Sequence, residues 1–215
     1  MVNNKKIIFL DIGTHKGQEL MSMFNTKYVL KMIFKSFIKN ILFIKSSTRP
    51  SNIELLNLFL NNLRFKSIRK NIKLIAVEPN YLFFDKKIYQ YVDDVFCLAL
   101  SQTKSPDFEI KNLFIANNDK LSMGSSLYSN KHNVSINNFQ KVVCCNPKSF
   151  VEQFEKNFVD NNTKVILRIN CEGSEDDIIY SFSSLLGKKL ILIMGSLKDV
   201  GEVKGKYYLE KLNNF

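Results

Sequence analysis

The feature that most constrains the fold is a series of short, β-branched apolar runs separated by segments with helical periodicity. Each run is bounded by turn residues, so we expect it to form a strand. The five runs are Lys6–Asp11, Ile72–Glu78, Val95–Leu100, Lys164–Cys171 and Leu190–Met194. Helical spacing is found between them, at Leu82–Tyr91, Lys148–Phe158 and Ser174–Leu186. This alternation predicts an α/β fold: a mostly parallel central sheet with helices on both faces.

Two regions interrupt the alternation. The first lies between the first two predicted strands, where lysines such as Lys31 and Lys35 recur at helical spacing among apolar residues, and a second helical segment follows. We therefore expect a helical insertion at about residues 25–71, within a single domain that spans residues 1–215. Packing against protein is the ordinary role of such a basic amphipathic helix. A contact between subunits of a homo-oligomer, a substrate lid and a position on a membrane surface remain open.

The second irregular region is Ser101–Asn146, which is rich in Asn and Ser. Short alternating stretches around Phe108–Ile110 and Val142–Cys144 predict an antiparallel excursion beside the carboxyl edge of the sheet. The chain continues for only about 20 residues beyond the fifth predicted strand. That leaves little room for two further strands, so a truncated far edge of the sheet is left open.

Composition narrows the class of protein. Hydrophobic residues make up 45% of the 215 residues, enough for one sizeable core. No apolar stretch approaches the length of a transmembrane helix, and the apolar run near the N-terminus is too short for a secretory signal. We therefore expect a cytoplasmic protein. The four cysteines form no Cys-x-x-Cys pair, which favours buried thiols and no metal site.

The net charge is strongly positive: 31 − 20 = +11. A basic surface attracts nucleic acid, anionic lipid or phosphorylated substrates. However, the chain is rich in Lys, Asn, Ile and Phe throughout, and all four have AT-rich codons. A biased genome alone could therefore produce the charge. The charge and the lysine-rich insertion favour nucleic-acid binding, which is kept as an alternative to a small-molecule acceptor.

The loop after the first predicted strand points to a ligand. Parallel sheets bind ligands outside the carboxyl ends of their strands, and Asp11–Gly17 leaves the first strand at that position. Its pattern, D-x-G-x-x-x-G, is neither a dinucleotide fingerprint nor a P-loop. Its aspartate would repel a phosphate, so the loop suits a cofactor with an ammonium group and no phosphate. The plainer interpretation is a glycine-containing β–α turn with an exposed aspartate.

Two further strand ends carry polar residues. Glu78 ends the second predicted strand, where a carboxylate can accept two hydrogen bonds from ribose hydroxyls. It could also be an ordinary exposed acid. The fourth strand ends in the segment Leu167–Glu175, whose charged residues are costly at the end of a buried strand unless they serve a site. Helix capping by Ser174 would explain part of that pattern without a function.

With these motifs in place, the chain resembles the FkbM-type methyltransferases, a family of class I, Rossmann-like enzymes that use S-adenosylmethionine. The matching segments follow the family order across most of the chain. They are D-I-G-T-H-K-G-Q at Asp11–Gln18, A-V-E-P-N at Ala76–Asn80, A-L-S at Ala99–Ser101, G-S-S-L at Gly124–Leu127 and L-R-I-N-C-E-G-S-E at Leu167–Glu175.

The resemblance implies a Rossmann-like methyltransferase fold and a set of site residues. The cofactor S-adenosylmethionine would be held by the loop, the second strand end and the A-L-S segment. These residues are Asp11, Gly13, Thr14, Gly17, Glu78, Pro79, Ala99, Leu100 and Ser101. Ser125, Ser126, Arg168 and Glu175 would contact the substrate, and His15, Glu172 and Asn170 would be catalytic. The acceptor that the family suggests is a hydroxyl of a sugar or other small molecule.

Two departures bear on the chemistry. The family has an aspartate where this chain has Asn170, and a lysine where it has Arg168. An asparagine cannot act as a carboxylate base or as a strong magnesium ligand. A hydroxyl acceptor must lose a proton, and His15 and Glu172 are the candidate bases. The alternatives are a nucleic-acid-binding or nucleic-acid-methylating protein, and a catalytically weakened cofactor-binding protein at a membrane surface.

Overall fold

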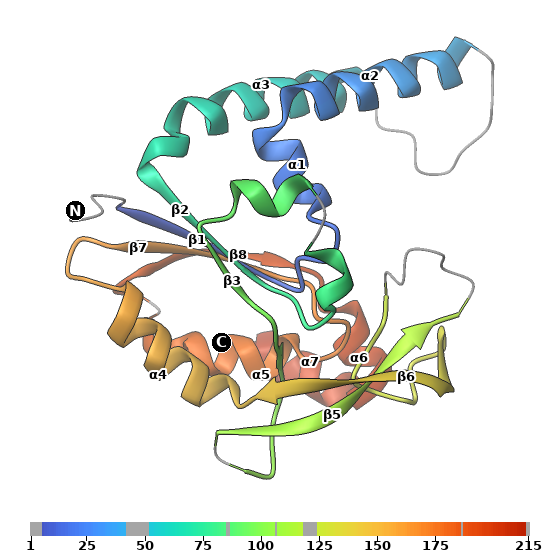
Figure 1. Cartoon of the computed structure of the whole chain (residues 1–215), viewed down its shortest axis with the longest axis vertical. Coiled ribbons are helices and arrows are strands. Elements are labelled where there is room, and N and C mark those ends of the chain that lie inside the picture. Colours follow the sequence, from blue (N-terminus) through green and yellow to red (C-terminus); the bar gives the residue numbers. More distant parts are fainter. Residues whose placement is uncertain are drawn as a thin grey trace.

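The computed structural model describes residues 6–41, 52–84, 87–105, 107–117, 124–185 and 187–213, and its centre is a five-stranded parallel sheet (Figure 1). In chain order the strands are β1 (Ile7–Ile12), β2 (Ile72–Val77), β3 (Asp94–Phe96), β7 (Lys164–Ile169) and β8 (Leu190–Gly195). Their order in the sheet is β3-β2-β1-β7-β8, and all four pairings are parallel. The predicted α/β class is confirmed. Strand order reverses between β1 and β7, which is where such sheets leave a crevice.

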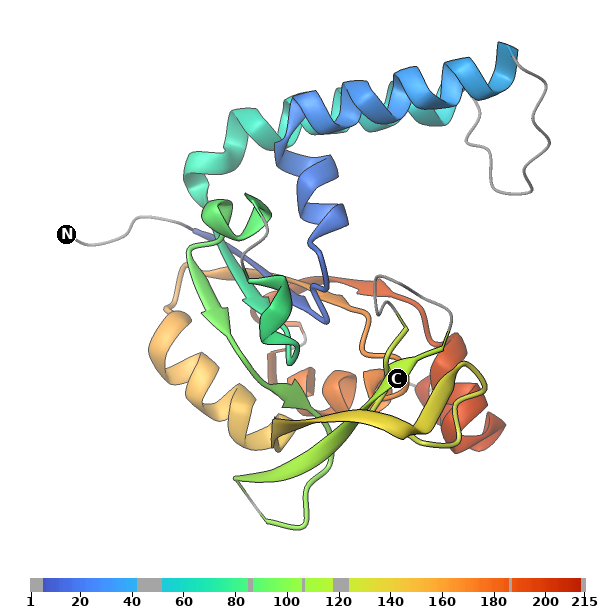
Figure 2. The ribbon, with the colours of Figure 1, turned by 45° about the vertical axis from the view of Figure 1, so that its right-hand side comes forward.

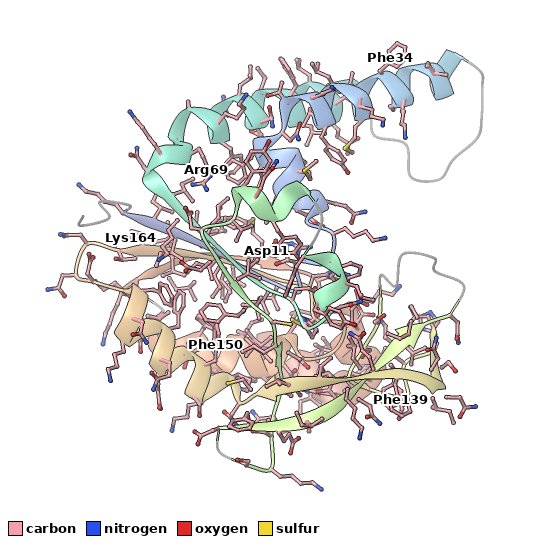
Figure 3. The ribbon with its side chains drawn as sticks, viewed as in Figure 1. Asp11, Phe34, Arg69, Phe139, Phe150 and Lys164 are labelled. Carbon is pink, nitrogen blue, oxygen red and sulfur yellow. The ribbon has the colours of Figure 1, made fainter. Side chains whose placement is uncertain are left out.

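Alternating side chains of the central strands build two cores, one on each face of the sheet. Ile8, Leu10 and Ile12 of β1 belong to one cluster, which packs against α4 (Pro147–Phe158), α5 (Glu175–Ser181) and η4 (Phe182–Leu185). Phe9 belongs to the other cluster, with side chains of α1 (Gln18–Phe24). Figure 3 shows Phe150 on the α4 side of the sheet and Asp11 in the interior. The period of two within a strand thus explains both layers.

The region predicted as an insertion forms two long helices. They are α2 (Thr26–Ile41) and α3 (Asn52–Ile68), and η1 (Arg69–Asn71) leads from α3 into β2. The two helices lie side by side and form the outermost layer beyond α1 in both ribbon views (Figures 1 and 2). Asn62, which is fully buried, ties α3 to the end of α1 by donating to the carbonyl oxygens of Ser22 and Met23, both at 3.0 Å.

The second irregular region forms a small separate sheet of three strands. They are β4 (Ala99–Leu100), β5 (Phe108–Ala116) and β6 (Val134–Cys145), in the order β4-β6-β5. The predicted antiparallel excursion is confirmed as the β5–β6 pair and is longer than expected. The predicted strand Val95–Leu100 was wrong as a single element. It divides into β3, which pairs with β2, and β4, which pairs with β6, because an unbroken apolar run does not say which sheet it joins.

The predicted helix Leu82–Tyr91 was also wrong in type. The segment contains two short 3-10 turns, η2 (Tyr81–Phe83) and η3 (Lys87–Tyr91). The side chain of Asn80 accepts a hydrogen bond from the Leu82 N–H, which tightens the first turn, and Tyr89 donates its hydroxyl to the His15 carbonyl oxygen at 2.6 Å. These tertiary contacts override helical propensity in so short a connection.

After β8 the chain forms α6 (Lys198–Lys204) and α7 (Lys206–Asn213). β8 is therefore an edge of the central sheet within the residues that the structure describes. None of the helices in those residues is both long and apolar enough to cross a bilayer.

Candidate functional site

A cavity opens at the carboxyl ends of β1, β2 and β7, between the central sheet and the small sheet, and its empty space of about 510 Å³ includes solvent at its open mouth. Nine residues of the predicted site line it: Gly13, His15, Glu78, Pro79, Ala99, Leu100, Ser125, Asn170 and Glu172. Segments far apart in the sequence therefore meet at the switch point of the sheet, where the strand ends were expected to converge.

Glu78 is the most buried acid in the cavity wall, at 3% exposure. Its Oε2 accepts the backbone N–H of His15 at 2.7 Å, and its Oε1 accepts the backbone N–H of Asn80 at 2.8 Å. Burial raises the pKa of this carboxyl, and the electrostatic interaction with His15 and the two N–H groups oppose that rise. Each carboxylate oxygen has a second lone pair, so Glu78 can hold the loop and still accept hydrogen bonds from a ligand.

His15 is held in place by its backbone. Its φ of 52° lies in the left-handed region, which is uncommon for a residue with a side chain. Its N–H donates to Glu78, and its carbonyl oxygen accepts the Tyr89 hydroxyl. The ring stacks near Phe83, with centroids 6.3 Å apart. The imidazole therefore stands at the cavity wall on a backbone fixed at both ends.

Glu172 also has a left-handed backbone, with φ of 58°, and its side chain is engaged. It forms an ion pair with Lys131, and Lys131 pairs as well with Asp199 at 3.0 Å. Burial would lower the pKa of Lys131, but hydrogen bonds to these two acids outweigh it and hold that pKa above its ordinary value. Because Lys131 occupies the Glu172 carboxylate, His15, which also lines the cavity, is the better-placed candidate base.

Asp11 does not line the cavity. It is fully buried, and its Oδ1 pairs with Nη1 of Arg168 at 2.7 Å, directly across the β1–β7 register. Burial raises the pKa of Asp11 to about 6 even though Arg168 opposes it. Arg168 also donates to the Gly13 carbonyl oxygen at 3.2 Å and pairs with Glu19 at 2.8 Å. These two residues, expected to contact cofactor and substrate, instead join the ends of β1 and β7.

Five other predicted site residues have structural partners and do not line the cavity. Thr14 donates its hydroxyl to the Asp11 carbonyl oxygen, and Gly17 begins α1 with φ of 62°. Ser101 donates its N–H to the Cys145 carbonyl oxygen, and Ser126 donates its hydroxyl to the Glu172 carbonyl oxygen. Glu175 accepts the N–H groups of Cys171 and Gly173, both at 2.8 Å. They fix the loops around the cavity.

Gly13 is required by the packing of two loops. Its φ is +77°, and a Cβ at this position would lie 2.1 Å from the backbone oxygen of Asn170. The N–H of Asn170 in turn donates to the Ile12 carbonyl oxygen at 2.9 Å. Glycine therefore allows the turns after β1 and β7 to touch, and this contact forms the floor of the cavity.

The sequence did not identify the apolar part of the cavity wall. Phe83, Leu98, Leu113 and Leu127 line it together with Ala99 and Leu100. These residues come from η2, the β3–β4 connection, strands β4 and β5 of the small sheet and the β5–β6 connection. Leu127 ends the G-S-S-L segment, and Phe83 and Leu98 lie close to the Ala76–Asn80 and Ala99–Ser101 segments, whereas Leu113 lies in a segment without a motif. Lys131 was also missed, because nothing local marks a lysine whose acid lies 41 residues away.

The charge of the cavity lining differs in sign from the net charge of the chain. Of the described residues that form it, two are acidic, Glu78 and Glu172, and none is Lys or Arg, although the chain carries a net charge of +11. Such a cavity disfavours a phosphate and favours a neutral or cationic ligand. Within the described part of the chain, no three His, Cys, Asp or Glu side chains are grouped to hold a metal ion.

Comparison with known proteins adds no identification: no family model, no curated protein and no solved structure matches this chain.

Proposed function

We propose that the chain is an S-adenosylmethionine-dependent methyltransferase with a Rossmann-like fold. The observation that most supports the proposal is the cavity at the switch point, which is apolar and acidic in an otherwise basic protein. S-adenosylmethionine has an adenine, a ribose, a cationic sulfonium and no phosphate, and the lining suits each of these groups. Bound there, it would supply an electrophilic methyl group.

The wall offers a partner for each part of the nucleoside. Glu78 has a free lone pair on each carboxylate oxygen for the ribose hydroxyls. The apolar surface of Leu98, Leu113 and Leu127 suits the face of a purine. Glu172 and Asp199 share one cation, Lys131, so this cluster keeps a net negative charge beside the cavity, which favours a sulfonium or an ammonium group.

The acceptor that we propose is a hydroxyl group of a sugar or other small molecule. Its proton would pass to an imidazole nitrogen of His15, since Glu172 is occupied by Lys131. Asn170 lines the cavity and can orient an acceptor by hydrogen bonding, but it cannot take a proton. Positioning would then account for much of the rate.

Calorimetric titration tests the cofactor. We expect S-adenosylmethionine to bind the full chain and ATP, which carries a triphosphate on the same nucleoside, to bind far more weakly. Glu78→Gln keeps the size of the side chain but removes its charge, and hydrogen bonds to charged groups contribute about 1.5–3 kcal/mol. The variant should therefore bind S-adenosylmethionine about 10- to 150-fold more weakly.

The matched control is Glu152→Gln, an exposed acid on α4, which should leave affinity unchanged. Circular dichroism and thermal unfolding of each variant would verify that it is folded. No detectable heat with millimolar S-adenosylmethionine on folded wild-type protein would refute the proposal, as would ATP binding of equal strength.

A further inference from the structure

The α2–α3 pair exposes two apolar rows on its surface. Leu30, Phe34 and Ile38 of α2 are all exposed and lie four residues apart, so they share one side of the helix. On α3 the exposed row follows helical spacing of three and four residues, and it consists of Ile53, Leu56, Leu60 and Leu63. We name these seven residues the hairpin rows. Soluble proteins rarely leave large apolar surfaces without a partner.

The apolar residues of the hairpin rows are not needed for packing within the protein. A different side of each helix supplies its internal contacts: Val29 and Ser36 of α2 are buried, as are Leu55 and Asn62 of α3. Figure 3 shows Phe34 pointing away from the sheet, on the outer side of the helix pair. Because the pair is the outermost layer in both ribbon views, a broad flat surface could meet it without touching the small sheet (Figures 1 and 2).

The charge beside the rows has one sign. α2 carries four lysines and no acidic residue. α3 carries two basic residues, Arg64 and Lys66, and one acidic residue, Glu54. The two helices together therefore have six basic residues and one acidic residue. Lys31 and Lys35 are exposed and each follows a member of the α2 row directly in sequence. The two lysines therefore form a second row on α2, parallel to Leu30 and Phe34 and rotated from them by about 100° about the helix axis.

From this pattern we propose that the α2–α3 pair docks on an anionic phospholipid surface. Apolar side chains would enter the boundary between headgroups and acyl chains, and the neighbouring lysines would meet the negative headgroups. A second copy of the chain fits less well, because a two-fold contact through the hairpin rows would bring the same lysines of both copies together, with Glu54 as the one acidic residue that α2 and α3 supply from each copy. The proposal does not depend on the identity of the cofactor.

Co-sedimentation of the full chain with vesicles tests the proposal. We expect binding to vesicles of phosphatidylcholine mixed with phosphatidylserine, and much weaker binding to phosphatidylcholine alone. Lys31→Gln/Lys35→Gln should lower the partition coefficient on the mixed vesicles about 30-fold, at about fivefold for each lysine near an anionic surface. Phe34→Ser should lower it at least about tenfold, through loss of buried apolar area.

Matched controls exist on other faces of the protein. Phe108 of β5 has the same exposure as Phe34, 63%, so Phe108→Ser removes an equivalent side chain outside the hairpin rows. Lys148 and Lys156 are exposed on α4, across the central sheet from α2 and α3, and Lys148→Gln/Lys156→Gln removes the same charge. All these side chains are on the surface, so the variants should fold, and neither control should change binding.

Three results would overturn the proposal. The first is absence of binding to the mixed vesicles, or equal binding to both kinds of vesicle. The second is a loss of binding in the control variants as large as that in the hairpin variants. The third is a dimer in sedimentation velocity without lipid that Phe34→Ser dissociates, since that result would assign the rows to a second copy of the chain.

Discussion

Replacing Arg168 by methionine should destabilise the protein mainly through Asp11. Asp11 is fully buried, its Oδ1 lies 2.7 Å from Nη1 of Arg168, and in the described part of the chain its Oδ2 has no hydrogen-bond partner. Two unit charges about 4 Å apart interact by about 4 kcal/mol at an effective dielectric constant of about 20. Breaking a buried ion pair by removing one partner typically costs about 3–5 kcal/mol. We expect a loss of that size at about pH 8, where Asp11 is ionised.

The loss should depend on pH with a definite sign. The pKa of Asp11 is raised from 3.8 to about 6, so the native state binds the extra proton and stability falls as the pH rises between these values. Without Arg168, which opposes this rise, the pKa of Asp11 moves higher and the fall extends to higher pH. Near pH 5 Asp11 is protonated in both proteins, so only about 1 kcal/mol should remain, from the other contacts of Arg168.

Urea unfolding of wild type and variant at about pH 5 and pH 8 measures both quantities. Asp11→Asn/Arg168→Met removes both charges, so it should recover most of the stability at pH 8 and lose the part of the pH dependence that Asp11 contributes. Lys73→Met is the control, because its pair with Asp94 is partly exposed and should contribute less than about 1 kcal/mol. The reasoning would be refuted if Arg168→Met lowered the free energy of unfolding no more than the control does, or by the same amount at both pH values.

Two further variants test the loops around the cavity. Gly13→Ala should destabilise well beyond Gly187→Ala in urea unfolding: φ is similar at both positions, but only at Gly13 would the new Cβ meet backbone, 2.1 Å from Asn170. Equal losses would show that the loop gives way. Lys131→Met should cost about 3–5 kcal/mol, because it leaves two acids without their shared cation. A loss below about 1 kcal/mol would mean that solvent neutralises those acids.

Much of the fold could be predicted because local sequence carries it. β1, β2, β7 and β8 match apolar runs bounded by turns, and α4 matches its helical period within one residue. The split of Val95–Leu100 between two sheets could not be predicted, because partner choice depends on β6, about 40 residues later. The 3-10 turns at Tyr81–Phe83 and Lys87–Tyr91 depend on contacts with other elements and were equally hidden.

The candidate site was predictable where a strand end carries it. Gly13, Glu78 and Asn170 each follow a central strand, and the parallel sheet brings these ends to one edge. The direction of side chains was harder to foresee. Arg168 lies 157 residues after Asp11 in the chain but directly beside it in the sheet, and no local pattern reports that pairing. Ion pairs of this range become visible only when strand register is known.

The burial of Asp11 changes how the loop Asp11–Gly17 relates to the cavity. An aspartate that faces Arg168 cannot meet a ligand directly, but it fixes the ends of β1 and β7, whose turns touch at Gly13 and Asn170. The acids that do reach the cavity are Glu78, directly after β2, and Glu172, after β7. The acidic groups that would recognise a cationic nucleoside are thus in the two flanking loops. Asp11 of the motif loop would affect affinity only by fixing the positions of those loops. On this reasoning Glu78→Gln should weaken binding by loss of charge in the cavity, whereas a substitution at Asp11 should affect stability first and binding only where the loops move.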